Sequence, residues 1–221
     1  MSESVACAKF ILGGEHSVVT RGRALAFPLP SATIKIKIHQ ESENPLQRKL
    51  IVNGVERSSE ELSMIQNLCL RVGAAFPPAH IEIESRIPIG AGLGSSAALC
   101  VALAKHFHPD APKNKIAEFA LSGEELFHKK PSGIDPFTIA IEEPIIFSSK
   151  NLDFRVLNTE AFKKSDLCFA LFDTGQTHKT MEVQANVERT KIQNPLIYED
   201  LMDALSSNVE QMLRAFESGN G

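Results

Sequence analysis

The chain has 221 residues, of which 43% are hydrophobic and 23% are charged, and its formal net charge is -4. This balance is typical of a globular protein with a buried core, and the length suffices for one large domain or two small ones. The acidic net charge argues against the dense basic face that binds nucleic acid. No apolar run reaches the length of about 18 residues that crosses a membrane.

The first half of the chain predicts mainly strands. Isoleucines that alternate with charged residues indicate strands with one buried and one solvated face. Asn53-Gly54 predicts a tight hairpin turn, and Ser58 or Ser59 can cap a helix with acidic residues in its first turn. In chain order, the predicted elements are strands at 5–12 and 32–39, a hairpin at 50–55, a helix at 58–76 and a strand at 81–87.

The second half predicts more helices than strands. Apolar residues recur there at helical spacing, and Pro109 ends the first of these helices. In chain order, the predicted elements are helices at 95–107 and 113–128, short strands at 145–148, 154–157 and 167–172, and helices at 181–193 and 196–216. An order of strands first and mixed elements later favours an α+β fold over a regular βα alternation.

A glycine-rich turn lies between the strand at 81–87 and the helix at 95–107, and residues 88–98 read PIGAGLGSSAA. Glycines allow backbone N–H groups to approach oxygens closely, and the helix that follows points its positive dipole end at the same place. The Walker pattern fails because its lysine is missing. The dinucleotide pattern fails because Ser95 stands where its third glycine belongs. We therefore predict a phosphate-binding loop, with a purely structural glycine turn as the alternative.

Three charged residues leave a functional and a structural role open. Glu124 lies at the edge of the apolar face of its predicted helix, which suits a metal ligand or a surface charge. Asp135 lies between Pro131 and Pro136, which predict a short stiff loop in place of a helix, so it is either functional or a turn former. Lys9 is the one charged residue in an apolar strand, so it either reaches the surface or meets a carboxylate.

Three segments together resemble the GHMP family of small-molecule kinases: residues 9–19, which read KFILGGEHSVV, the loop at 88–98, and residues 131–135, which read PSGID. Within that family the pattern is most similar to the mevalonate kinases. Galactokinases continue with acidic and aromatic residues where this chain has SVV at 17–19. A later stretch at 173–180, which reads DTGQTHKT, is similar to the mevalonate kinases as well.

The resemblance implies an enzyme that uses ATP and Mg²⁺ to phosphorylate a small-molecule alcohol, with mevalonate as the expected acceptor in isoprenoid precursor synthesis. A phosphomevalonate, homoserine or sugar kinase and an inactive relative are the alternatives. The implied fold has an N-terminal ribosomal S5-like domain over 1–157 and an incomplete ferredoxin-like domain over 158–221. The start of the chain lacks the features of a signal peptide, so a cytoplasmic location is expected. A homodimer is left open.

The resemblance also assigns roles to matching positions. Asp135 is expected to be the catalytic carboxylate, with Lys9 as its cationic neighbour. Mg²⁺ is expected on Glu124 and Ser96, with Ser95 as a rival to Ser96. The acceptor alcohol is expected to contact Glu15, His16 and Thr180. The expected nucleotide-binding residues are Pro88, Gly90, Ala91, Gly92, Leu93, Gly94, Ser95, Ser96 and Ala97.

One motif of the family is missing from this chain. The family carries a glycine-rich segment near its C-terminus that reads like K-x-T-G-A-G-G-G, and no such segment occurs here. We therefore expect a C-terminal subdomain that lacks at least one helix and its strands, and a chain that is a fragment or a truncated form.

Overall fold

The computed structural model describes residues 2–15, 17–20, 22–40, 48–76, 79–128, 130–160, 168–175 and 180–218. Its contacts divide the chain into two units. Unit 1 comprises Met1–Lys9, Pro28–Ile87 and Gly94–Glu142, and unit 2 comprises Phe10–Phe27, Pro88–Leu93 and Glu143–Gly221. A search of the described part finds no helix with the length and apolar character needed to cross a membrane.

Unit 1 is built on a mixed sheet. Its strands are β1 (Ser2–Gly13), β2 (Ala24–Gln40), β3 (Leu50–Val52), β4 (Val55–Glu56) and β5 (Ala79–Ser85), and β1 and β2 also continue into unit 2. β2 runs antiparallel to β5 with Ile36 opposite Ile83, β3 runs parallel to β5 and antiparallel to β4, and β1 pairs with β2. The isoleucines of β2 are buried, whereas Lys35 and Lys37 between them are part-exposed and form ion pairs. The predicted alternation is therefore confirmed.

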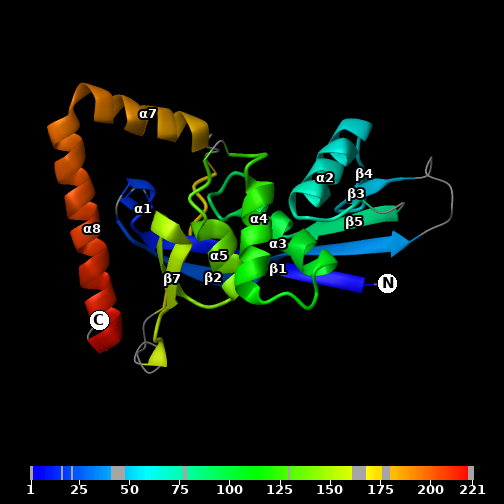
Figure 1. Ribbon diagram of the computed structural model, residues 1–221, viewed down its shortest axis with the longest axis horizontal. Coiled ribbons are helices and arrows are strands. Elements are labelled where there is room, and N and C mark those ends of the chain that lie inside the picture. Colours follow the sequence, from blue (N-terminus) through cyan, green and yellow to red (C-terminus); the bar gives the residue numbers. More distant parts are fainter. Residues whose placement is uncertain are drawn as a thin grey trace. The chain divides into compact units, whose positions relative to one another are not determined.

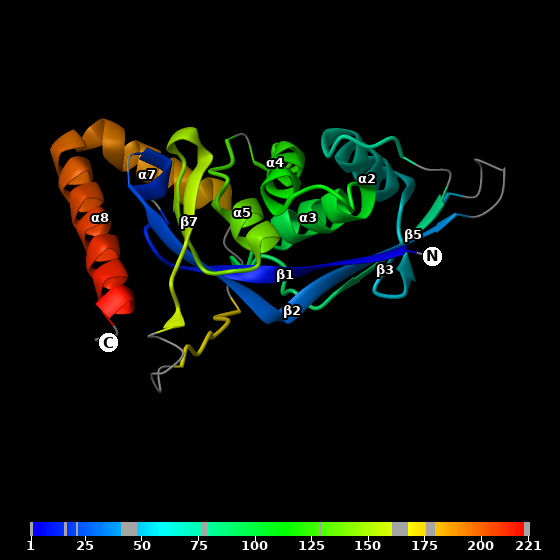
Figure 2. The ribbon, with the colours of Figure 1, turned by 60° about the horizontal axis from the view of Figure 1, so that its bottom comes forward.

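Four helices of unit 1 lie on one side of its strands (Figure 2). They are α2 (Ser59–Arg71), α3 (Ser95–Phe107), α4 (Lys113–Glu124) and α5 (Ile134–Ile141). Ser58 caps α2 in a reciprocal capping box with Glu61, as the sequence indicated. α4 packs closely on α3: a Cβ atom added at Gly123 would lie only 2.9 Å from Cys100 Sγ. This close approach matters for the site, since the residue after Gly123 is Glu124.

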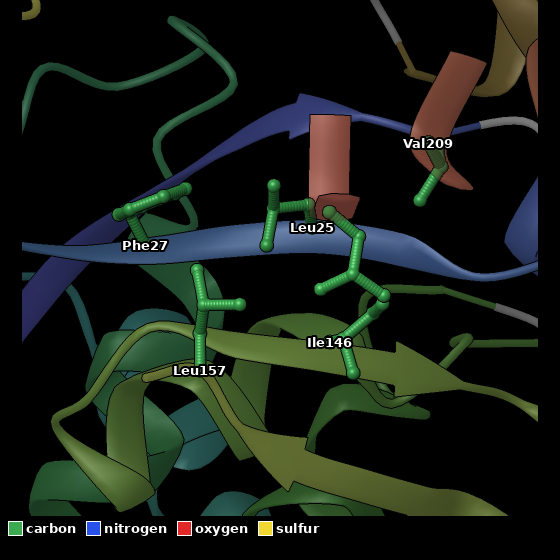
Figure 3. Close-up of a cluster of buried hydrophobic side chains, with 6 residues drawn as sticks. Leu25, Phe27, Ile146, Leu157 and Val209 are labelled. Carbon is green, nitrogen blue, oxygen red and sulfur yellow. The ribbon is translucent and has the colours of Figure 1, made fainter. Parts of the chain in front are cut away.

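Unit 2 combines the first residues of β2 with two further strands and helices. These elements are α1 (Ser17–Thr20), β6 (Ile145–Ser148), the short 3-10 helix η2 (Lys150–Leu152), β7 (Asp153–Val156), α7 (Thr180–Gln193) and α8 (Pro195–Ser218). β6 runs antiparallel to both β2 and β7, and α7 and α8 meet at a corner (Figure 1). An apolar cluster holds the strands to α8 (Figure 3), and it consists of Leu25, Phe27, Ile146, Leu157, Val209 and Leu213.

The fold is α+β, as predicted, and most predicted elements are confirmed within a few residues. The strand predicted at 167–172 is wrong for its described residues, Cys168 to Phe172, which form no strand. Of these residues, Phe169 packs its ring edge-on, 5.6 Å from the Phe10 ring and 5.4 Å from the Phe27 ring, whereas Phe172 is exposed. Apolar alternation makes a strand only where a backbone partner is available.

The loop predicted around Asp135 is also wrong, because Asp135 is the second residue of α5. Pro136 follows it within the first turn of the helix. A proline is tolerated there because first-turn N–H groups have no partner inside the helix. The helix predicted at 113–128 likewise ends early, at Glu124, and three residues in turn conformation follow.

Candidate active site

Lys9 and Asp135 form a largely buried ion pair in unit 1. Lys9 Nζ lies 3.0 Å from Asp135 Oδ1, and Lys9 is only 5% exposed. β1 supplies the lysine and the first turn of α5 supplies the carboxylate. Burying an ammonium group is costly unless it is paired. Of the two roles that the sequence left open for Lys9, the structure therefore shows the one in which it meets a carboxylate.

Gly94, at the end of the glycine-rich loop, packs directly against this pair. It caps α3 with a φ of 72°. A Cβ atom there would lie 2.9 Å from Cε and 3.0 Å from Cγ of Lys9, and 3.5 Å from Asp135 Oδ2. Both the left-handed backbone and the lack of space therefore require glycine at this position.

Two helices begin at this place without a side-chain cap. Gly94 precedes α3, and Gly133, with a φ of 90°, precedes α5; neither helix has a side-chain hydrogen bond at its N-cap. The first N–H groups of a helix have no partner inside the helix, and together with the helix dipole they attract anions. The role of Gly133 was missed in the sequence, although a glycine directly before an apolar run was visible in PSGID.

The loop before Gly94 has the backbone of a glycine turn. Gly90 has a φ of 78° and Gly92 a φ of 73°, in the left-handed region that glycine enters at little cost. A Cβ atom on Gly92 would meet nothing within 4 Å. Residues 88–93 belong to unit 2, so their phosphate contacts stay a prediction.

Glu124 is a buried carboxylate at the end of α4. It is 3% exposed, and its Oε1 atom has no hydrogen-bond partner in the part of the chain that the structure describes. Burial raises the pKa of Glu124 from 4.5 to about 7, although a hydrogen bond with the Ser96 side chain lowers it. The charge of Asp135 raises this pKa further and that of Lys9 lowers it, so both groups interact electrostatically with Glu124.

These groups fit a small divalent cation such as Mg²⁺. An unpaired buried carboxylate oxygen beside a serine hydroxyl supplies the hard oxygen ligands that Mg²⁺ prefers. Within the described ranges, no group of three or more His, Cys, Asp or Glu side chains is suited to hold a metal. An ion on Glu124 and Ser96 would therefore take most of its ligands from phosphate oxygens and water, as Mg²⁺ commonly does.

The predicted acceptor residues are not brought to this pair by any described contact. Glu15 is exposed and belongs to unit 2. His16 lies outside the described residues, and Thr180 begins α7 with a side chain that is not described. Their roles stay predictions.

A protein-family model described as "GHMP kinases N terminal domain" matches residues 59–142. The matched segment contains Gly94, Ser96, Glu124 and Asp135. It thus covers the whole glycine-rich loop and the site apart from Lys9.

Several curated proteins similar to this chain are mevalonate kinases. The chain is 30% identical over 232 residues to that of Pyrococcus abyssi, an alignment covering 92% of this chain and 66% of the relative. It is 28% identical over 194 residues to that of Aspergillus fumigatus, covering 80% of this chain but 36% of the relative. The chain therefore spans between about one third and two thirds of the length of such relatives.

Solved structures show the same fold. The mevalonate kinase of Methanococcus jannaschii matches with a TM-score of 0.71 at 22% identity, covering 96% of this chain and 72% of that chain. A Streptococcus pneumoniae phosphomevalonate kinase in complex with phosphomevalonate and AMPPNP matches with a TM-score of 0.72 at 15% identity, covering 100% of this chain and 75% of that chain. At these identities the likeness establishes the fold and leaves the substrate open.

Proposed function

This chain belongs to the GHMP kinase family, and from that premise we propose that it carries the phosphoryl-transfer site of an ATP-dependent kinase whose acceptor is mevalonate. The observation that supports this most is the Lys9–Asp135 pair, which packs against Gly94 at the uncapped start of α3. Mevalonate is favoured as acceptor because the similar curated proteins are mevalonate kinases. The product would be 5-phosphomevalonate, an isoprenoid precursor.

The residues divide the work of phosphoryl transfer among them. Asp135 orients the acceptor hydroxyl and takes its proton as the new O–P bond forms and ADP leaves. Lys9 balances the charge of Asp135 and stabilises negative charge on the group in transit. The first N–H groups of α3 donate to phosphate oxygens. This division suits a reaction that depends on positioning and charge neutralisation more than on covalent chemistry.

Mg²⁺ would be held by Glu124 and Ser96. When bound, it neutralises phosphate charge and thereby assists departure of ADP. The remaining roles proposed for the chain are nucleotide contacts by residues 88–97 and acceptor contacts by Glu15, His16 and Thr180. We also propose a domain boundary after residue 157 and a cytoplasmic location. Measuring the oligomeric state in solution would decide whether the protein is a homodimer.

The direct test supplies the purified chain with ATP, Mg²⁺ and one acceptor at a time. The panel is mevalonate, phosphomevalonate, homoserine and galactose, with ADP release and ³¹P NMR of the product as readouts. Phosphorylation of mevalonate with the highest kcat/KM would support the proposal. A preference for another acceptor would assign a different GHMP kinase, and nucleotide binding without ADP release in the presence of any acceptor would indicate an inactive relative.

A further inference from the structure

Glu142 lies at the end of α5 opposite Asp135 and joins two lysines. It is the C-cap of α5 and adopts a left-handed backbone with a φ of 63°. One carboxylate oxygen accepts a hydrogen bond from Lys105 of α3. The other lies 2.9 Å from the Nζ atom of Lys113, the first residue of α4. A glutamate in this strained conformation requires contacts that hold it there.

Each lysine also donates to a backbone carbonyl. Lys105 Nζ donates to Val5 O of β1 at 3.3 Å, and Lys113 Nζ donates to Ile141 O of α5 at 2.9 Å. The second contact satisfies a carbonyl in the last turn of α5, where a cation also complements the helix dipole. Hydrogen bonds from the two lysines lower the pKa of Glu142, although its partial burial alone would raise it.

The elements that meet at Glu142 are those that carry the candidate site. β1 supplies Lys9, α3 supplies Ser96, α4 supplies Glu124, and α5 supplies Asp135. α5 has only eight residues, a length of about 12 Å, over which a helix is stiff. Its N-terminal end has no side-chain cap. A displacement at Glu142 would therefore reach Asp135 along the helix axis.

Apolar packing encloses most of α5, and the contacts at Glu142 add a directional constraint at its C-terminal end. Phe137, Ile139 and Ala140 are among the buried residues that pack around the helix. Close packing resists displacement of the helix in general, whereas hydrogen bonds at one end fix a particular position along the axis. Hydrogen bonds to Glu142 and Ile141 depend steeply on distance and angle, so a small slide along the axis would break them.

We propose that Glu142 is a positioning residue, which through Lys105 and Lys113 sets the place of α5 and so the meeting of Asp135 with Lys9. The inference concerns geometry within unit 1, and its effect on turnover rests on the proposed kinase function. The three side chains are partly exposed, at 44% for Glu142, 23% for Lys105 and 55% for Lys113. Exposed ion pairs stabilise a fold only slightly, so the consequence should be seen in catalysis and not in stability.

Glu142→Gly tests whether catalysis changes while stability does not. Glycine removes the carboxylate and at the same time relieves the strain of the left-handed backbone. We expect a melting temperature within about 2–4 °C of the wild type, since the two effects on stability oppose each other. We expect kcat to fall about tenfold because a misplaced catalytic group is costly, with the KM for ATP changed less than about twofold. Glu142→Gln should give a smaller fall of the same kind.

A second readout needs no activity. The rate of acylation of Lys9 by a lysine-specific reagent, followed by mass spectrometry, should rise several-fold in Glu142→Gly as its contact with Asp135 loosens. Glu143→Gln, at the exposed neighbouring position, is the matched control and should change neither quantity. Unchanged Lys9 labelling in Glu142→Gly would overturn the inference, whatever happens to kcat. A wild type that releases no ADP would refute the kinase proposal, and labelling would still decide the role of Glu142.

Discussion

Lys9 and Glu124 in the candidate active site of unit 1 and the apolar cluster of unit 2 are similarly buried but opposite in chemistry. Lys9 and Glu124 are 5% and 3% exposed, and Leu25 and Val209 are 0% and 1% exposed. Burying hydrocarbon contributes about 25 cal/mol per Å² to folding, whereas burying charge costs stability unless the charge is well paired. The unit 2 cluster thus stabilises the fold, whereas in unit 1 Lys9 is compensated by its pair with Asp135 and ionised Glu124 costs stability. Substitutions in the two regions should therefore have different effects.

The largest effect should come from Asp135→Asn. Loss of the proton acceptor should reduce turnover by about 10²–10⁴, the usual contribution of a general base. Nucleotide affinity should stay nearly unchanged, because the loop and α3 are intact. Steady-state kinetics and equilibrium binding of ATP measure the two quantities. Full retained turnover would remove Asp135 from the mechanism.

Leu25→Ala should show the reverse behaviour. It leaves a cavity in the unit 2 cluster and should lower the free energy of unfolding by about 2–5 kcal/mol. Turnover per folded molecule should be unaffected. Denaturant unfolding measures the loss, and Leu201→Ala on the exposed side of α8 is the control, with an expected change within about 0.5 kcal/mol. If kcat in Leu25→Ala fell by more than the fraction of folded protein, the cluster would affect catalysis as well as stability. That result would contradict the distinction between the two regions.

Glu124→Gln should make the protein more stable at neutral pH in the absence of Mg²⁺. The pKa of Glu124 is about 7 in the folded protein, compared with its ordinary value of 4.5, which applies to the unfolded chain. The unfolded chain therefore loses its proton first as pH rises, and the wild type loses stability between about pH 4.5 and 7. The pKa difference corresponds to about 3 kcal/mol at pH 8.

The measurement compares free energies of unfolding of wild type and Glu124→Gln from pH 4.5 to 8. The two should agree at low pH and diverge as pH rises. Glu125→Gln is the matched control, because Glu125 is exposed and pairs with Arg71. A pH-independent difference for Glu124→Gln would contradict the view that its ionised form is costly.

The smallest effect compares two glycines of the loop. Gly92→Ala and Gly94→Ala both force alanine into a left-handed backbone, at about 1–2 kcal/mol each. Only at position 94 must Lys9 also move, and this overpacking should cost about 1–3 kcal/mol more. Unfolding measurements on both variants give the difference. Equal losses would mean that Gly94 is not pressed against the ion pair.

The glycine turn before α3 was a local feature and could be found in the sequence. The glycines at 90, 92 and 94 adopt positive φ values, and α3 begins at Ser95 and ends at Phe107, as predicted. Turns and helix starts depend on neighbouring residues, so a short stretch of sequence contains the information. Lys9 was likewise visible as a charge in an apolar strand.

Tertiary structure decided the rest. Whether Lys9 reaches water or a carboxylate, and how deeply Glu124 is buried, depend on the packing of β1, α3, α4 and α5, which are distant in the chain. Packing also made Asp135 part of a helix, since Pro136 is compatible with its first turn, and it used Phe169 for ring contacts where a strand was predicted. Local sequence sets what each segment can form, and the partners that it meets determine which of these forms is stable.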